Sequence, residues 1–160
     1  SPIAKCDVHR RISISTRTGL RSCSENAPGT SSAVYEFWSS DLLAIFRQAG
    51  IPRKVPPPYE SGCRMEETAA KGSGPQITSP REGIVYSLRV KALSSERVPL
   101  SAVTDADTRK IHWFVNETYL GESLSGKTFF WSPKPGTFVI RTVDDLGRSA
   151  VRDVFLNAVE

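Results

Sequence analysis

The stretch IHWFV at residues 111–115 decides how the second half of this chain folds. It is rich in β-branched and aromatic residues, which favour a strand, and Trp113 stands at its centre. On both sides of it, short β-rich or alternating runs are separated by turn signals such as residues 133–136 (PKPG) and 144–147 (DDLG). This pattern begins after Pro75, and no helical period interrupts it.

The spacing of these runs predicts eight short strands. Short strands with such regular turn signals indicate two antiparallel sheets packed face to face. The predicted fold class is mainly β, an immunoglobulin-like antiparallel β-sandwich preceded by a small hairpin-plus-helix segment. The predicted strands are Gln76–Ser79, Gly83–Val90, Val98–Val103, Lys110–Val115, Thr118–Gly121, Lys127–Trp131, Thr137–Val143 and Ser149–Leu156.

Trp113 is the predicted centre of the core, because an immunoglobulin-like sandwich keeps a tryptophan in the middle of such a strand. The other predicted core residues are Phe138, Ile140, Val151 and Phe155. No cysteine lies in this half of the sequence, so the disulfide that joins the two sheets of antibody domains is absent. Packing alone must therefore hold the predicted sheets together.

The first half of the chain predicts a small β-hairpin. Residues 8–16 (VHRRISIST) alternate Ile12 and Ile14 with polar neighbours, which is the pattern of a half-buried strand. Residues 17–19 supply a turn, and residues 20–23 are predicted to return as a short second strand.

A helix is predicted after a loop at residues 24–32. Ser39 or Ser40 can cap its beginning, and Gly50 ends it before Pro52. One apolar stripe runs along the helix, so we expect it to pack through a single face. The stripe consists of Leu42, Ile45, Phe46 and Ala49.

The chain is predicted to divide into two regions joined by a linker. The prolines at 56–58 favour extended polyproline geometry, and the Gly/Ser/Lys-rich residues 71–74 indicate a boundary. We expect a first region at 1–62, a linker at 63–75 and the sandwich at 76–160.

Composition and charge exclude several classes of protein. The 21 Lys and Arg residues exceed the 17 Asp and Glu residues only mildly, and they form no basic stripe of the kind that nucleic-acid binding needs. No apolar run reaches the roughly 20 residues that cross a bilayer. The sequence begins at Ser1 without a methionine or a signal peptide, so we expect it to be a fragment of a longer protein.

The motifs that could carry chemistry are weak. Residues 121–128 (GESLSGKT) match the phosphate-loop pattern, but Phe129 and two prolines follow, so no helix can begin there and no nucleotide site is expected. His9 and His112 are the only histidines, and neither belongs to a recognisable catalytic set. The acidic pairs Asp105/Asp107 and Asp144/Asp145 offer too few oxygen ligands for calcium and are expected to form turns.

Three cysteines, Cys6, Cys23 and Cys63, lie in the first half. Their spacing fits no zinc site. Two interpretations stay open from spacing alone: three buried thiols, or one disulfide with a cysteine left over, which would imply an oxidising compartment.

The chain resembles the carboxy-terminal part of the penicillin-binding protein 1C family over almost its whole length. In the first half the resemblance rests on residues 35–43 (YEFWSSDLL), 46–53 (FRQAGIPR) and 56–58 (PPP), with Cys6, His9, Arg10, Thr18 and Gly19. In the second half it rests on residues 77–83 (ITSPREG), 113–116 (WFVN), 131–136 (WSPKPG) and 143–148 (VDDLGR).

The resemblance implies a periplasmic peptidoglycan synthase tethered to the inner membrane, in which a glycosyltransferase precedes a transpeptidase. Residues 1–62 would then be the end of the transpeptidase region, and the anchor would precede Ser1. The S-x-x-K, S-x-N and K-T-G motifs of the transpeptidase are not matched: residues 1–5 have one residue too many, and residues 125–128 lack the glycine. No catalytic residue, cofactor or metal ligand is therefore assigned.

A periplasmic setting also implies an oxidised cysteine pair. Cys6–Cys23 across the predicted hairpin is the first choice, and Cys63 is the alternative partner.

Two functions are expected from the resemblance and the fold. The first is an accessory module that positions the synthase or docks a periplasmic protein, such as an alpha-2-macroglobulin-like protein or another cell-wall synthesis protein. The second is a carbohydrate-binding module that grips the glycan strands of peptidoglycan through exposed aromatic side chains, for which Tyr119 and either Phe129 or Trp131 are candidates.

Overall fold

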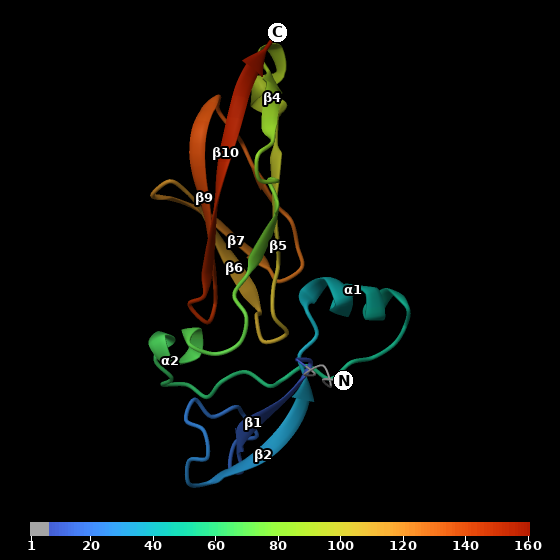
Figure 1. Ribbon diagram of the computed structural model, residues 1–160, viewed down its shortest axis with the longest axis vertical. Coiled ribbons are helices and arrows are strands. Elements are labelled where there is room, and N and C mark those ends of the chain that lie inside the picture. The colour runs from blue at the N-terminus through green and yellow to red at the C-terminus, as the bar shows by residue number, and fades with distance from the viewer. Residues whose placement is uncertain (1–6) are drawn as a thin grey trace, which may run out of the picture. The chain divides into compact units, whose positions relative to one another are not determined.

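The strands predicted after Pro75 are all present in the computed structural model, which describes residues 7–160 (Figure 1). Strands β3 (Gln76–Ser79), β5 (Val98–Val103) and β6 (Lys110–Val115) have the predicted bounds. The other strands of this half are β4 (Val85–Arg89), β7 (Thr118–Leu124), β8 (Phe129–Trp131), β9 (Gly136–Asp144) and β10 (Ser149–Val159).

These strands form a sheet of five, in the order β4-β10-β9-β6-β7, and a sheet of three, in the order β3-β5-β8. Buried side chains from both sheets make one core, so the predicted β-sandwich is confirmed. One pairing differs from the antiparallel expectation, because β4 runs parallel to β10. A short 3-10 helix, η1 (Val90–Ser95), which the sequence pattern did not predict, follows β4.

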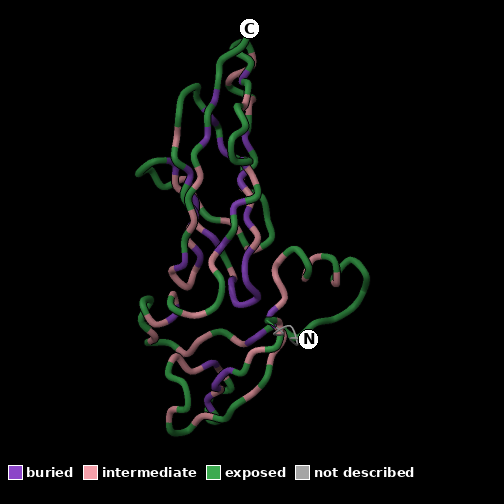
Figure 2. Tube along the Cα trace, viewed as in Figure 1, coloured by how far each residue is buried: buried purple, intermediate pink, exposed green. Residues whose placement is uncertain are grey.

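Trp113 lies at the centre of this core. Its side chain is fully buried, as are Ile140 of the same sheet and Leu100 of the opposing sheet. Phe138 is half-buried and packs edge-on against Trp131, with 5.3 Å between the ring centroids. Figure 2 shows the buried positions recurring along the strands of the sandwich, as expected when alternate side chains face inward.

A buried ion pair holds the turn between β9 and β10. The Arg148 Nε donates to the Asp144 Oδ2 at 2.8 Å, and both side chains are almost fully buried. The other carboxylate oxygen of Asp144 accepts the backbone N–H groups of Leu146 and Arg148. The Arg148 Nη2 also donates to the Thr108 Oγ1. The prediction that Asp144 forms a turn is therefore confirmed, and the turn depends on its charge as well.

The described residues divide into two units. Unit 1 holds the residues up to Gly72 together with Asp105–Asp107, and unit 2 holds Ser73–Thr104 and Thr108–Glu160. Unit 2 is the sandwich described above.

Unit 1 contains a hairpin whose second strand was predicted in the wrong place. Strand β1 (His9–Ser15) pairs antiparallel with β2 (Thr30–Glu36), which comes from the stretch expected to be loop and its continuation. The turn at residues 17–19 does reverse the chain, but Arg21 makes only isolated bridges, to Ile14 and to Tyr59. The returning segment is too short for a strand, and the chain continues to β2 on the other side of β1.

The described part of unit 1, from Asp7 onward, contains two helices. Helix α1 (Ser40–Gln48) lies within the predicted helix. Helix α2 (Met65–Ala69) was not predicted and lies in the expected linker, where the Glu67 carboxylate accepts the backbone N–H of Arg64 and helps to cap the helix.

The small apolar core of unit 1 is built around Phe37, which is 4 % exposed. Two guanidinium groups lie over its ring, those of Arg10 at 4.6 Å and Arg21 at 5.4 Å from the ring centroid. Arg10 forms an ion pair with Asp105 and Arg21 forms one with Asp107, so these acids do more than shape a turn. Cation–π contacts and ion pairs thus supplement a core with few apolar residues.

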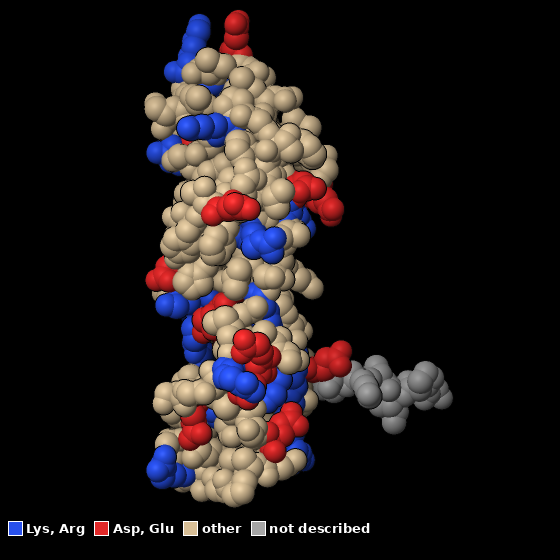
Figure 3. Space-filling view, turned by 90° about the vertical axis from the view of Figure 1, so that its left-hand side faces the viewer, with Lys and Arg blue, Asp and Glu red and all other residues tan. Residues whose placement is uncertain are grey.

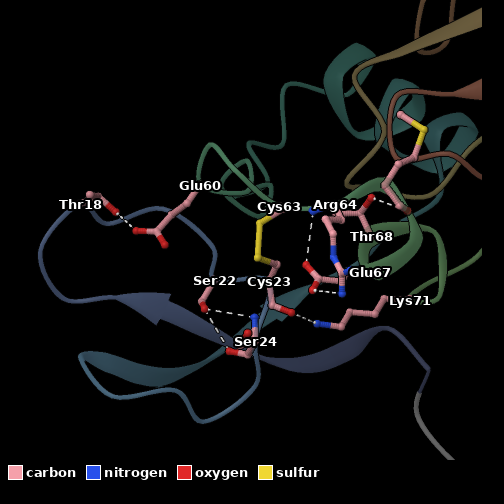
Figure 4. Close-up of a disulfide and its surroundings, with 11 residues drawn as sticks. Thr18, Ser22, Cys23, Ser24, Glu60, Cys63, Arg64, Glu67, Thr68 and Lys71 are labelled. Carbon is pink, nitrogen blue, oxygen red and sulfur yellow. Dashed lines mark hydrogen bonds and ion pairs between the residues drawn. A yellow bond between two sulfur atoms is a disulfide. The ribbon is translucent and has the colours of Figure 1, made fainter.

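A disulfide joins Cys23 to Cys63, with their Cα atoms 5.7 Å apart (Figure 4). The two segments are brought together by backbone hydrogen bonds: the Arg21 N–H donates to the Pro58 oxygen, and the Glu60 N–H donates to the Arg21 oxygen, each at 2.9 Å. The Lys71 Nζ also donates to the backbone oxygen of Cys23.

The first choice of pairing, Cys6–Cys23, is therefore wrong, and the alternative partner Cys63 is the one bonded to Cys23. The reason is that the segment carrying Cys23 lies beside residues 58–60, a contact between distant parts of the sequence that the local hairpin pattern could not reveal. Cys6 lies outside the described residues.

We expect the Cys63→Ser substitution to lower the free energy of unfolding of unit 1 by about 2–4 kcal/mol, because the disulfide closes a loop of 40 residues and restricts the unfolded chain. Urea unfolding followed by the amide NMR signals of β1 and β2 measures this loss. The control is Ser31→Ala at an exposed position of β2, which should change the value by no more than about 0.5 kcal/mol. Equal losses in the two variants would contradict the pairing.

Candidate docking face

The outer face of the five-stranded sheet carries apolar side chains in a fixed register. Val85 of β4 lies beside Phe155 of β10. One row across the sheet pairs Val151 with Arg141, and Arg141 with Phe114. We call the exposed or half-buried apolar side chains of this surface, with the charged side chains between them, the docking face. Its apolar members are Val85, Phe114, Tyr119, Val139, Val151 and Phe155.

The docking face exposes more apolar side chains than the outer face of a sheet usually does. The solvated face of a sheet is normally polar, and contiguous apolar patches on a monomer often mark interaction sites. Here Val151 is 54 % exposed and Phe155 is 42 % exposed, on the same strand and two pleats apart. Val85 and Val139 are exposed on the two strands that flank β10.

An aromatic cluster occupies the β6–β7 side of the docking face. The Phe114 and Tyr119 rings lie 5.2 Å apart at 58°, and the Tyr119 hydroxyl lies 3.0 Å from the His112 Nδ1. Glu122 contacts both His112 and Lys110 at ion-pair distance. The cluster fixes the Tyr119 ring while leaving about half of that residue exposed.

Two charged side chains stand among the apolar ones. Arg141 is next to Val151 across the β9–β10 ladder, and Asp153 is next to Val139. Within residues 7–160 neither of these charged groups forms an ion pair, so both are available to a partner. On the side of the protein that Figure 3 presents, the two signs of charge are interspersed, in keeping with the absence of a basic stripe in the sequence.

Strand β4 forms one edge of the five-stranded sheet, and this edge is protected at Arg89, the last residue of the strand. The Glu96 Oε1 accepts both the backbone N–H and the Nε of Arg89, at 3.1 and 2.9 Å. These hydrogen bonds lower the pKa of Glu96 below its ordinary value, and the bond from the Arg89 side chain has the larger effect. A charged group that occupies an edge donor discourages strand addition there, so the face of the sheet is a better docking surface than this edge.

Two of the predicted core residues belong to this face instead. Val151 and Phe155 are wrong as core predictions, because β10 alternates in the opposite phase and turns Val154 and Leu156 inward. Both phases of β10 contain apolar residues, so the sequence could not separate the core from the exposed face.

The other candidate residues do not converge on one centre. His9 lies near Glu36 in unit 1, whereas His112 belongs to the aromatic cluster. The phosphate-loop pattern at 121–128 covers the end of β7 and the following turn, and β8 rather than a helix comes next. No group of three or more His, Cys, Asp and Glu side chains in residues 7–160 is placed to hold a metal ion.

The exposed aromatic residues were only partly foreseen. Tyr119 faces outward, but Trp131 is buried and Phe129 is half-buried. Phe130, between them on β8, is the side chain that faces solvent, at 62 % exposure. None of the helices within residues 7–160 has the length and apolarity to cross a membrane.

Residues 64–154 match the model of the Penicillin-Binding Protein C-terminus Family, and the chain belongs to that family. The resemblance found in the sequence is thus confirmed at this level. No curated protein shows a significant sequence match to the chain.

Several solved structures are similar to part of the chain. The fibronectin(III)-like modules of Clostridium thermocellum CbhA align with 13 % identity and a TM-score of 0.42, over 53 % of this chain and 98 % of that one. The Bacteroides ovatus mixed-linkage glucan utilization locus protein SGBP-B, solved with a mixed-linkage heptasaccharide, aligns with 15 % identity and a TM-score of 0.36, over 55 % of this chain and 25 % of that one.

Substitutions at neighbouring positions of β10 test the assignment of its two faces. We expect Leu156→Ala to lower the free energy of unfolding of the sandwich by about 2–5 kcal/mol, because it removes a buried side chain from the core. Phe155→Ala should cost less than Leu156→Ala, about 1 kcal/mol, because Phe155 lies outside the core and is 42 % exposed. Urea unfolding followed by tryptophan fluorescence measures both, and the reverse order of the two losses would show that the faces are exchanged.

Proposed function

We propose that this chain is a non-catalytic accessory region of a penicillin-binding protein, and that it docks a protein partner through the docking face. The observation that carries the proposal is the exposed apolar set on one sheet face, Val85, Val139, Val151 and Phe155, held in place by strand pairing. A rigid sheet presents such a surface at little entropic cost on binding.

Charge on the docking face supports a specific protein partner. Arg141 and Asp153 interrupt the apolar surface with opposite signs. Charged groups among apolar contacts fix the register of a complex and disfavour wrong partners more than they add affinity. A protein surface with an apolar centre and one acid and one base in matching places would satisfy all of these groups together.

The setting that we propose is the bacterial periplasm. The Cys23–Cys63 disulfide supports an oxidising compartment, since structural disulfides are rare in the cytosol. The parent protein would be a bifunctional peptidoglycan glycosyltransferase and transpeptidase tethered to the inner membrane. The partner would be a periplasmic protein, an alpha-2-macroglobulin-like protein or another component of cell-wall synthesis, and its docking would position the synthase.

Site-specific photocrosslinking in cells that carry the parent protein tests the docking face. A photoreactive residue at Val151 or Phe155 should form a crosslink to a defined protein, because these side chains would contact the partner. The same residue at Phe130, an exposed aromatic position on the other sheet, should form no such crosslink.

A substitution that introduces a charge into the docking face provides the second part of this test. Val139→Asp should reduce the crosslink from Phe155 roughly tenfold, because it places a carboxylate within the apolar contact. Equal crosslinking from Phe130 and Phe155, or a crosslink that Val139→Asp leaves unchanged, would contradict the proposal.

The aromatic cluster favours a second candidate function, binding of peptidoglycan glycan strands. Tyr119 is exposed and held by Phe114 and His112, so its ring could stack on the apolar face of a sugar. The proposal has less support than protein docking, because Phe155 lies three strands away from β7 on the same face and Phe130 lies on the other sheet, so neither ring extends this platform.

Co-sedimentation with purified peptidoglycan separates the two functions. If the second function holds, the bound fraction should fall several-fold in Tyr119→Ala, because stacking on an aromatic ring is lost, and should stay unchanged in Phe155→Ala. Peptidoglycan that fails to retain the wild-type chain, or retains both variants equally, would exclude glycan binding through this cluster.

A further inference from the structure

Helix α1 leaves an apolar surface of unit 1 uncovered. None of its residues is buried, and Ile45 on its apolar stripe is 57 % exposed. Phe46 is covered in part by Trp38, whose ring meets it edge-on with 5.1 Å between the centroids. Short helices depend on the packing of an apolar face for stability, yet unit 1 covers this face only partly.

Two hollows lie next to each other along the segment that follows helix α1, and they share Pro52 and Arg53. The first has a volume of about 230 Å³ and the second one of about 220 Å³. We call the two hollows together the α1 groove. The first is walled by Leu43, Phe46, Arg47, Ile51 and Val55, and the second by Val34, Tyr35, Glu36 and Lys54.

The charged side chains of the α1 groove are mainly basic. Arg47, Arg53 and Lys54 line it, against the one acid Glu36. Arg53 lies over the Phe46 ring at 4.8 Å and 3.6 Å from the Glu36 carboxylate. Lys54 lies over the Tyr35 ring at 5.0 Å.

The one acid of the groove does not balance these cations. Glu36 also accepts a hydrogen bond from the Trp38 Nε1 at 2.8 Å and lies 3.8 Å from His9. Within the described residues, Arg47 and Lys54 form no ion pair. The α1 groove therefore combines apolar hollows with unneutralised positive charge.

We propose that the α1 groove binds a segment of a separate partner protein in which apolar residues alternate with Asp or Glu. Each hollow has room for one apolar side chain of that segment, and its carboxylates would lie against Arg47, Arg53 and Lys54. This is the groove mode of peptide recognition, in which spaced apolar anchors give affinity. Complementary charge gives the choice of partner.

This binding is separate from the docking face of the sandwich. The groove belongs wholly to unit 1, whereas the docking face belongs wholly to unit 2. A variant in the α1 groove should leave the crosslink from Phe155 unchanged, so failure of one proposal does not imply failure of the other.

Selection from a random peptide library displayed on phage, with the 160-residue chain immobilised, identifies the preferred ligand chemistry. The enriched peptides should share spaced apolar residues with Asp or Glu between them. A synthetic peptide of the enriched consensus should then bind in fluorescence anisotropy, and should bind more weakly as NaCl rises from about 0.1 M to about 0.5 M.

Matched variants locate the binding. Arg47→Glu should raise the dissociation constant of the consensus peptide roughly tenfold or more, because it reverses one charge of the groove. Arg17→Glu makes the same change at an exposed turn outside the groove and should leave the constant within about twofold. Ile51→Ser, at a position that lines the first hollow and is exposed to solvent, should weaken binding without unfolding the helix, which circular dichroism checks.

Four results would overturn the proposal. The first is a library that yields no enriched peptide, and the second is enrichment of peptides without acidic residues. The third is self-association of the chain in sedimentation velocity that Ile51→Ser abolishes, since the occupant would then be a second copy. The fourth is binding to vesicles of phosphatidylglycerol and phosphatidylcholine that Arg47→Glu abolishes, since the surface would then contact lipid.

Discussion

The burial of Trp113 between the two sheets is the interaction on which the rest of the sandwich depends. Its full burial sets which side chains of β6 face inward, and the hydrogen-bonded register carries that phase to β9 and then to β10. Because side chains alternate across a sheet, every inward residue fixes the outward position of its neighbours. The same packing therefore determines the docking face: Phe114 points outward because its neighbour Trp113 points into the core.

Much of the fold could be predicted from the sequence because its signals are local. Turn residues and β-rich runs located each strand of the sandwich, and three strands have the predicted bounds. The faces of β10 could not be predicted in this way, since Val151 and Phe155 alternate with the equally apolar Val154 and Leu156. Only the pairing of β10 with its neighbours distinguishes the two sets.

The candidate sites were less predictable, because they depend on contacts between distant residues. Nothing in the local sequence of Cys23 indicates that it lies near Cys63, and nothing near Arg21 indicates its ion pair with Asp107. The stripe on helix α1 was visible in the sequence. That Phe46 and Arg47 of this helix line a hollow together with Ile51, and that the hollow has basic walls, required the structure.

The place of β10 in the five-stranded sheet has a consequence for synthesis of the protein. It is the last strand in the sequence, yet it lies between β4 and β9. A ribosome makes the chain from its amino terminus, so β4 and the β9-β6-β7 group exist for a time with no strand to join them. Long-range pairings of this kind form slowly. The nascent sheet therefore holds two unpaired inner edges until Val159 leaves the exit tunnel, and in that interval it is most open to chaperones and to aggregation.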